Sequence, residues 1–238
     1  MQAHKPLLTT EIMLTRNRDY GLNTLAPVVT MMMSGVYATA AVALADILRT
    51  PDERWVRLSM WLYLSIFATL ATTRYLHYNA LVTRPAPFQL PFQLSVGFVV
   101  ASCFACLPLS MGGPDGWLQA MNLNILIAPM GVILNRNLTR WVSVENLSDD
   151  LQPLVKSRIA DLAEAIRPSQ FATVLFLGLT VFAWVTRGTP GPWNEILTGV
   201  NLAFCALGIR VIIRDARSFQ RFQEGIDNLR PAQETAAR

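Results

Sequence analysis

Long apolar stretches constrain the fold of this chain more than any other feature of its sequence. Each stretch is close to the ~20 residues that a helix needs to cross a bilayer, and a chain segment can cross alone only by bonding its own backbone as a helix. Only 15% of the residues are charged, against about 25% in soluble globular domains. The six stretches are residues 24–48, 55–81, 93–111, 117–135, 170–186 and 196–213.

These stretches predict the fold class and, with the arginines, the topology. Six helices joined by short turns form three antiparallel hairpins, so we expect an all-α, polytopic transmembrane bundle. Arginines gather after the second, fourth and sixth stretches, and the turn between the third and fourth has none. Because positively charged loops stay on the cytoplasmic side, both termini are expected in the cytoplasm. The segment 46–57 opposes this rule, since it mixes arginines with acidic residues.

Composition also bears on source and location. Lysine occurs only at Lys5 and Lys156 among 20 basic residues, and such a preference for arginine hints at a GC-rich bacterial genome. The expected location is therefore the inner (cytoplasmic) membrane of a bacterium. The net charge of +4 is spread over the loops rather than gathered in one patch, so no nucleic-acid partner is predicted.

The chain is expected to form one domain, because each polar segment beside or between the stretches is shorter than the roughly 50 residues of a small soluble domain. Residues 1–23 form a cytoplasmic N-terminal segment, residues 24–213 the six-span domain, and residues 214–238 a cytoplasmic helix and tail. Apolar residues at helical spacing predict an amphipathic cytoplasmic helix at 149–166. The helix after the sixth span is expected to end at Pro231, since proline interrupts a helix interior.

The fourth span carries a small and polar face. Lipid tails offer amide groups no hydrogen bonds, so such a face must contact other protein or a water-filled path. We interpret this span as the centre of the bundle and as part of the wall of a path for an ion or a small solute. The residues that share the face at helical spacing are Asn124, Ala128, Gly131 and Asn135.

Other polar residues lie within the spans or near their ends. Asn122 and Asn201 either join neighbouring helices by hydrogen bonds or belong to the same path. His77, at the inner end of the second span, could sense pH or relay protons, although a lone histidine near an interface is more often an ordinary residue. Asp46, near the outer end of the first span, is expected to pair with Arg49 or another neighbour.

Small residues recur on single faces of the first, fourth and sixth spans. Small side chains let membrane helices approach closely, which replaces the hydrophobic drive that lipid cannot supply. The expected role is packing within the bundle or between copies in a homo-oligomer, and lining of a pore is the alternative. The residues are Gly35, Ala128, Gly131, Gly199 and Ala203.

A stripe of arginines follows the sixth span. Three partners are open: anionic lipid headgroups, the acidic residues of the 149–166 segment, or a cytoplasmic protein. We call Arg210, Arg214, Arg217 and Arg221 the arginine stripe.

The third span contains a C-x-x-C motif, Cys103 and Cys106, whose thiols one helical turn brings close together. Such a pair is what a quinone-linked thiol oxidoreductase of the membrane needs, but only Cys205 is left as a relay thiol. Buried cysteines usually act as small apolar residues, and reactive thiols need an electropositive, partly exposed site.

Absent motifs narrow the function classes. The sequence has no phosphate-binding loop, no H-E-x-x-H zinc site and no G-x-S-x-G nucleophile, so no enzyme activity, cofactor or metal is predicted. The first prediction is an oligomeric channel or transporter for an ion or small solute. The alternatives are a non-enzymatic membrane subunit that anchors, senses or signals to a cytoplasmic partner, and the thiol oxidoreductase.

Overall fold

The structure is a computed structural model that describes residues 26–81, 105–109, 115–123, 125, 129, 144, 147–164, 166–187, 189 and 191–236. For residues 26–30, 32, 33, 36, 71, 72, 74–81, 166, 168, 169 and 230–236 it describes the backbone alone. The segment 1–23 and most of the predicted third span lie outside the described residues.

The described part of the chain contains helices and no strand, so the all-α prediction is confirmed. Shorter helical pieces cover residues 105–109 and 116–123. The long helices are α2 (Ala26–Arg49), α3 (Arg54–Leu81), α6 (Gln152–Glu164), α7 (Ile166–Thr186) and α8 (Trp193–Ala236).

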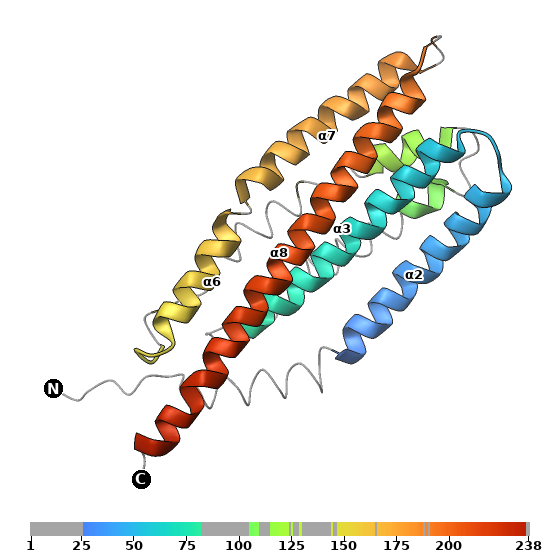
Figure 1. The fold of residues 1–238 in the computed structure, drawn as a ribbon. Coiled ribbons are helices and arrows are strands. Elements are labelled where there is room, and N and C mark those ends of the chain that lie inside the picture. The colour runs from blue at the N-terminus through green and yellow to red at the C-terminus, as the bar shows by residue number, and fades with distance from the viewer. Residues whose placement is uncertain are drawn as a thin grey trace.

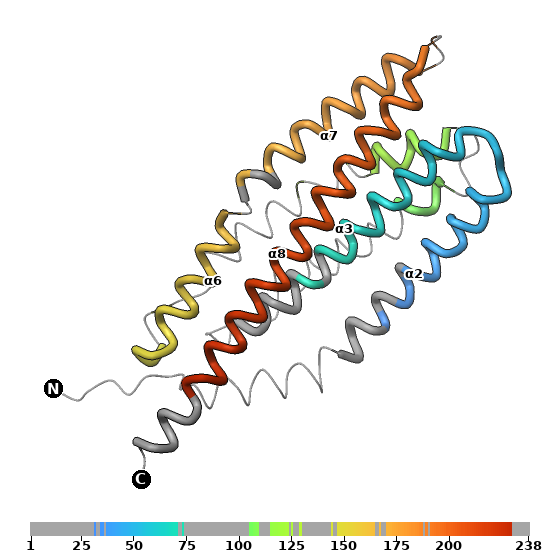
Figure 2. Tube along the Cα trace, viewed as in Figure 1, coloured from blue at the N-terminus to red at the C-terminus, as the bar shows by residue number. Residues whose placement is uncertain are grey.

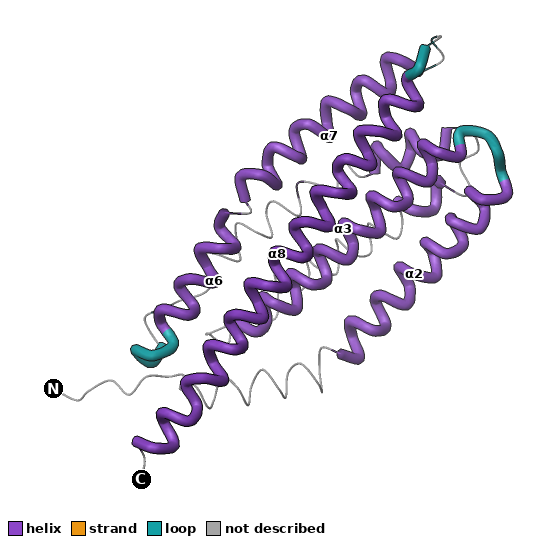
Figure 3. Tube along the Cα trace, in the orientation of Figure 1, coloured by secondary structure: helices purple, strands orange, loops and turns teal. Residues whose placement is uncertain are grey.

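Helix α8 is the axis of an elongated bundle (Figure 1). Helices α7 and α6 follow one another along one side of it, so that α7 lies beside its first half and α6 beside its second half (Figure 2). On the other side α3 packs along α8, and α2 packs on α3. Short loops join α2 to α3 and α7 to α8 at the same end of the bundle, which we call the turn end (Figure 3).

Two separate apolar cores hold these helices together. The larger one joins α2, α3, α7 and the first half of α8. At its centre the ring of Tyr63 stacks on that of Phe176 with centroids 4.9 Å apart, and Phe204 meets both rings edge-on. The smaller core joins α6 to the second half of α8 through Val155, Leu162, Phe222 and Ile226, with Leu147 and Leu151 before α6.

The outer surface of the larger core is apolar, which is unusual for a surface in water. Large side chains that face outward include Phe171, Val174 and Val185 in α7, 69–72% exposed, and Leu207 in α8, 56% exposed. Contiguous apolar surface of this kind marks contact with protein or membrane.

Among the described residues, α8 alone has both the length and the apolar composition to cross a membrane, and Gln170–Thr186 is apolar but shorter. The core helix of a soluble protein can have the same length and the same apolar composition. The count of six spans and the cytoplasmic position of the termini therefore stay predictions.

Prolines account for the differences in helix boundaries. The predicted amphipathic helix at 149–166 is α6, which starts at Gln152 and holds Pro153 in its first turn. Helix α7 starts at Ile166 rather than at residue 170, because Pro168 falls in the first turn, where its missing N–H has no intrahelical partner to lose. The expectation that α8 ends at Pro231 is wrong, since the helix continues to Ala236. A helix that is already long adds residues without a new nucleation cost. This allows α8 to continue for a few residues after the proline.

Candidate functional site

The predicted polar face of the fourth span falls largely outside the part of the chain that the structure describes. This applies to Asn124, Ala128, Gly131 and Asn135, which therefore stay predicted pathway residues. His77 belongs to α3, but its side chain is not among those described.

The two other predicted amides are engaged in contacts between helices. Asn201 of α8 is 1% exposed, and its Nδ2 donates to Oγ of Ser59 in α3 over 3.2 Å. Asn122 accepts a hydrogen bond of 2.8 Å from the indole N–H of Trp184 in α7. Both amides thus join helices, which is the structural role that sequence analysis weighed against a pathway.

A cluster of polar residues fixes the turn end of the bundle. Arg57 of α3 is buried, and its guanidinium donates to Oδ2 of Asp46 in α2 over 2.8 Å and to the carbonyl oxygen of Leu109. Asp46 therefore pairs with a neighbour, as expected, but with Arg57 across the turn rather than with Arg49. The charge of Arg57 is compensated although the side chain is withdrawn from water.

Glu53 occupies the centre of this cluster, and the sequence offers no local signal for it. Its backbone has φ 51°, the left-handed region, which costs a residue with a Cβ roughly 1–2 kcal/mol. Its carboxylate accepts hydrogen bonds from the indole N–H of Trp117 and, over 3.1 Å, from Nδ2 of Asn194 at the start of α8. The turn between α2 and α3 is thereby tied to two distant segments. We call Asp46, Glu53, Arg57, Trp117 and Asn194 the turn-end cluster.

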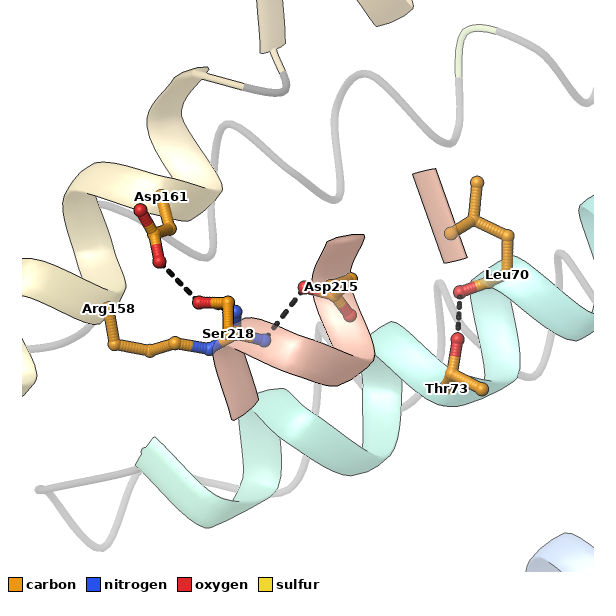
Figure 4. A network of polar contacts seen from close by, with 6 residues as sticks. All are labelled: Leu70, Thr73, Arg158, Asp161, Asp215 and Ser218. Atoms are coloured by element: carbon orange, nitrogen blue, oxygen red, sulfur yellow. Dashed lines mark hydrogen bonds and ion pairs between the residues drawn. The ribbon is translucent and has the colours of Figure 1, made fainter. Parts of the chain in front are cut away.

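A second polar cluster joins α6 to α8 within the smaller core (Figure 4). Arg158 of α6 is 2% exposed and donates to Oγ of Ser218 over 2.7 Å and to Oδ1 of Asp215 over 2.8 Å. The hydroxyl of Ser218 donates in turn to Asp161 of α6. The guanidinium also lies 5.9 Å from the ring centroid of Phe219. We call Arg158, Asp161, Asp215 and Ser218 the α6–α8 cluster.

The arginine stripe is exposed along its whole length. Arg214 forms an ion pair with Glu164 at the end of α6, which is one of the three kinds of partner that the sequence left open. Arg217 and Arg221 make no ion pair with any described residue. Within the part of the chain that the structure describes, those two charges are not compensated by an ion pair.

The predicted packing residues of α2 and α8 do not pack inside the described bundle. Gly35, Gly199 and Ala203 are exposed, and a Cβ on either glycine would meet nothing within 4 Å. Close helix contact occurs instead at Gly208, whose Cβ would lie 2.7 Å from Ile66, and at Gly225. The small faces of α2 and α8 at these residues are thus exposed rather than packed on another described helix.

The cysteines offer no exposed reactive thiol in the described residues. Cys106 and Cys205 are each 2% exposed and lie in the larger core, and Cys103 lies outside the described residues. The same part of the chain holds no group of three His, Cys, Asp or Glu side chains that could bind a metal ion. Burial among apolar side chains fits the packing role of these thiols.

No protein-family model, no curated protein and no solved structure matches this chain. The geometry itself therefore carries the functional argument. It consists of an apolar-surfaced bundle, a polar cluster at the turn end, and a charged two-helix extension formed by α6 and the second half of α8.

Proposed function

We propose that this chain is an integral membrane protein of a bacterial inner membrane, with the larger core in the bilayer. The spacing of charges on the helices supports this placement. In α7 the segment between Arg167 and Arg187 has no charged residue, and its 20 steps span ~30 Å at the helical rise, which equals the usual thickness of the hydrocarbon layer. In α8 the uncharged segment between Glu195 and Arg210 spans ~22 Å by the same measure, and Arg214 follows one helical turn later.

The helices also agree on where this layer begins and ends. Contacts from Glu53 to Asn194 and from Ser59 to Asn201 join residues 141 and 142 positions apart, so α3 and α8 run in the same direction and in register. The turn-end cluster then lies at one boundary of the uncharged layer, and Arg210 and Arg214 lie at the other. A slab bounded by charge on several helices is what a bilayer requires.

The function we propose is that of a non-enzymatic membrane subunit, which anchors a cytoplasmic protein partner or signals to it. The observation that carries the proposal is the second half of α8, held against α6 by the buried α6–α8 cluster and presenting Arg217 and Arg221 outward. Arg217 and Arg221 lie ~5 and ~10 Å beyond Arg214 along the helix. The Debye length in physiological salt is ≈ 8 Å, so headgroup charges at the level of Arg214 are largely screened from Arg221 and only partly from Arg217. An acidic protein surface is a better partner than the membrane for the end of the stripe at Arg221.

The experiment compares proteins that co-purify from native membranes with the parent and with Arg217→Gln/Arg221→Gln. We expect the double variant to lose an acidic partner that the parent retains. Arg187→Gln is the matched control, because it removes an arginine at the turn end and should retain the partner. Identical partners in all three samples would reject the proposal.

A homo-oligomeric channel or transporter is the second candidate. It is favoured by the outward small faces at Gly35 and at Gly199 and Ala203, which would let copies pack closely and bring their fourth spans around a common path. Flux of ions or small solutes into liposomes tests it, with Asn124→Leu as the variant. The candidate fails if the parent supports no flux, or if flux is unchanged in the variant.

The topology is part of the proposal. We propose six crossings, with both termini and the α6–α8 extension in the cytoplasm, as the positive-inside rule predicts. Resistance of the protein to carbonate extraction tests the embedding. A reporter enzyme fused after Arg238, active only in the cytoplasm, tests the side on which α8 ends.

A further inference from the structure

The start of α7 and the middle of α8 bring three arginines to one level of the bundle. Helices α6 and α7 run antiparallel to α8, and the ion pair of Glu164 with Arg214 fixes their register. Arg210 precedes Arg214 by four residues of α8, which is ~6 Å toward the turn end. Arg167 is the second residue of α7, which runs from Ile166 toward the turn end (Figure 1). The ion pair and the two arginines therefore belong to one small region between α7 and α8.

The charge of this region is not balanced within the described chain. Arg167, Arg210 and Arg214 are exposed, and Glu164 is bonded to Arg214 alone. Arg167 and Arg210 make no ion pair with any residue that the structure describes. Among the described residues, the region thus has an excess of two positive charges.

Apolar surface begins where the charge ends. Phe171 and Val174 are each 69% exposed on α7, and Leu207 is 56% exposed on α8. All three lie within two turns of the arginines, on the side toward the turn end. A ligand that satisfies both parts has an anionic head and an apolar chain.

We propose that Arg167, Arg210 and Arg214 bind the headgroup of an anionic phospholipid, whose acyl chains lie along the exposed apolar side chains of α7 and α8. Guanidinium groups donate paired hydrogen bonds to phosphate oxygens. The proposal rests on the membrane placement given above, but not on partner docking, which uses Arg217 and Arg221. It divides the arginine stripe into a lipid-binding part within the headgroups and a protein-binding part beyond them.

Native mass spectrometry of the purified protein tests the proposal by titration with phosphatidylglycerol or phosphatidylcholine. Both lipids carry a phosphate, and only the first has a net negative charge. We expect the parent to retain phosphatidylglycerol preferentially. Arg167→Gln/Arg210→Gln should weaken this retention by about 25-fold, or roughly fivefold for each arginine lost near the surface. Arg217→Gln/Arg221→Gln is the control with the same change in charge and should leave retention unchanged.

Three results would overturn the lipid site. The parent could retain both lipids equally, or both double variants could lose retention of phosphatidylglycerol to the same extent. Displacement of the lipid by millimolar inorganic phosphate would show a site for free phosphate instead. Release of the protein by carbonate would count against membrane placement itself. Loss of the cytoplasmic partner only from Arg217→Gln/Arg221→Gln would leave the docking proposal intact whatever the lipid result.

Discussion

Replacement of Arg158 by methionine is expected to detach α6 from α8 without unfolding the rest of the bundle. The arginine is almost fully buried, and its partner Asp215 has a side chain that is 9% exposed. Removing one member of a buried ion pair costs 3–5 kcal/mol, because the other charge is left in a poorly solvated site. Since Asp215 keeps some contact with water, we take ~3 kcal/mol, which is about a 100-fold change in the opening equilibrium.

Hydrogen–deuterium exchange of the α6 amides measures this change directly. Amides of a helix exchange when it opens locally, so their rates report the local opening free energy. In Arg158→Met the amides of Gln152–Glu164 should exchange about 100-fold faster than in the parent, and the amides of α3 should be unaffected. Arg217→Met is the matched control, because its side chain is exposed and makes no ion pair with a described residue. Its expected effect is within ~0.5 kcal/mol.

A double variant separates the two physical causes of such a loss. If the unpaired carboxylate is responsible, Arg158→Met/Asp215→Leu should regain most of the protection, since apolar replacement of a whole buried pair is often neutral or stabilising. Exchange in the double variant as fast as in the single one would refute this reasoning and assign the loss to packing of the arginine stem. Unchanged exchange in Arg158→Met would show that the pair contributes nothing to holding α6.

Further predictions concern the bundle itself. Gly208→Ala should lower the thermal unfolding temperature in detergent, at a cost of about 1–3 kcal/mol, because the added Cβ would lie 2.7 Å from a side chain of α3; Gly199→Ala, with open space around it, should leave that temperature unchanged or raise it. Asn201→Ala should cost about 0.6–1.7 kcal/mol in the same assay, the range for hydrogen bonds between membrane helices, and a larger loss would contradict a purely linking role. Arg187→Gln breaks the exposed ion pair with Asp115 and should cost less than ~1 kcal/mol, and added salt should reduce the difference in stability between parent and variant.

Features that depend on local periodicity were predictable from the sequence. The apolar stripe that predicts a helix at 149–166 is the stripe that α6 buries against α8. The continuation of the sixth apolar stretch into a charged helix is observed as α8. Gly199 and Ala203 do lie on one face of α8, as their spacing predicts. The spacing does not indicate which neighbour that face contacts. Since both sides of α8 carry small residues, only packing decides that Gly208 meets α3.

Contacts between distant segments were not predictable. Glu53 bonds Trp117 and Asn194, which lie 64 and 141 positions away. Its side chain is an unremarkable acid in a polar turn, and nothing nearby in the sequence indicates a partner. The burial of Arg57 inside the bundle was not predictable either, since an arginine before an apolar stretch is ordinarily expected to reach water.

The polar clusters explain how a bundle with so apolar a surface keeps one arrangement. Between helices in lipid the hydrophobic effect supplies little net attraction, so directional contacts must fix their rotation and register. Along α8 these contacts occur at three levels: Asn194 with Glu53, Asn201 with Ser59, and Asp215 and Ser218 with Arg158. Three fixed levels on one helix leave it no freedom to rotate. The side with Gly199 and Ala203 then faces outward, and in the membrane placement that we propose, lipid or a second membrane helix would cover it.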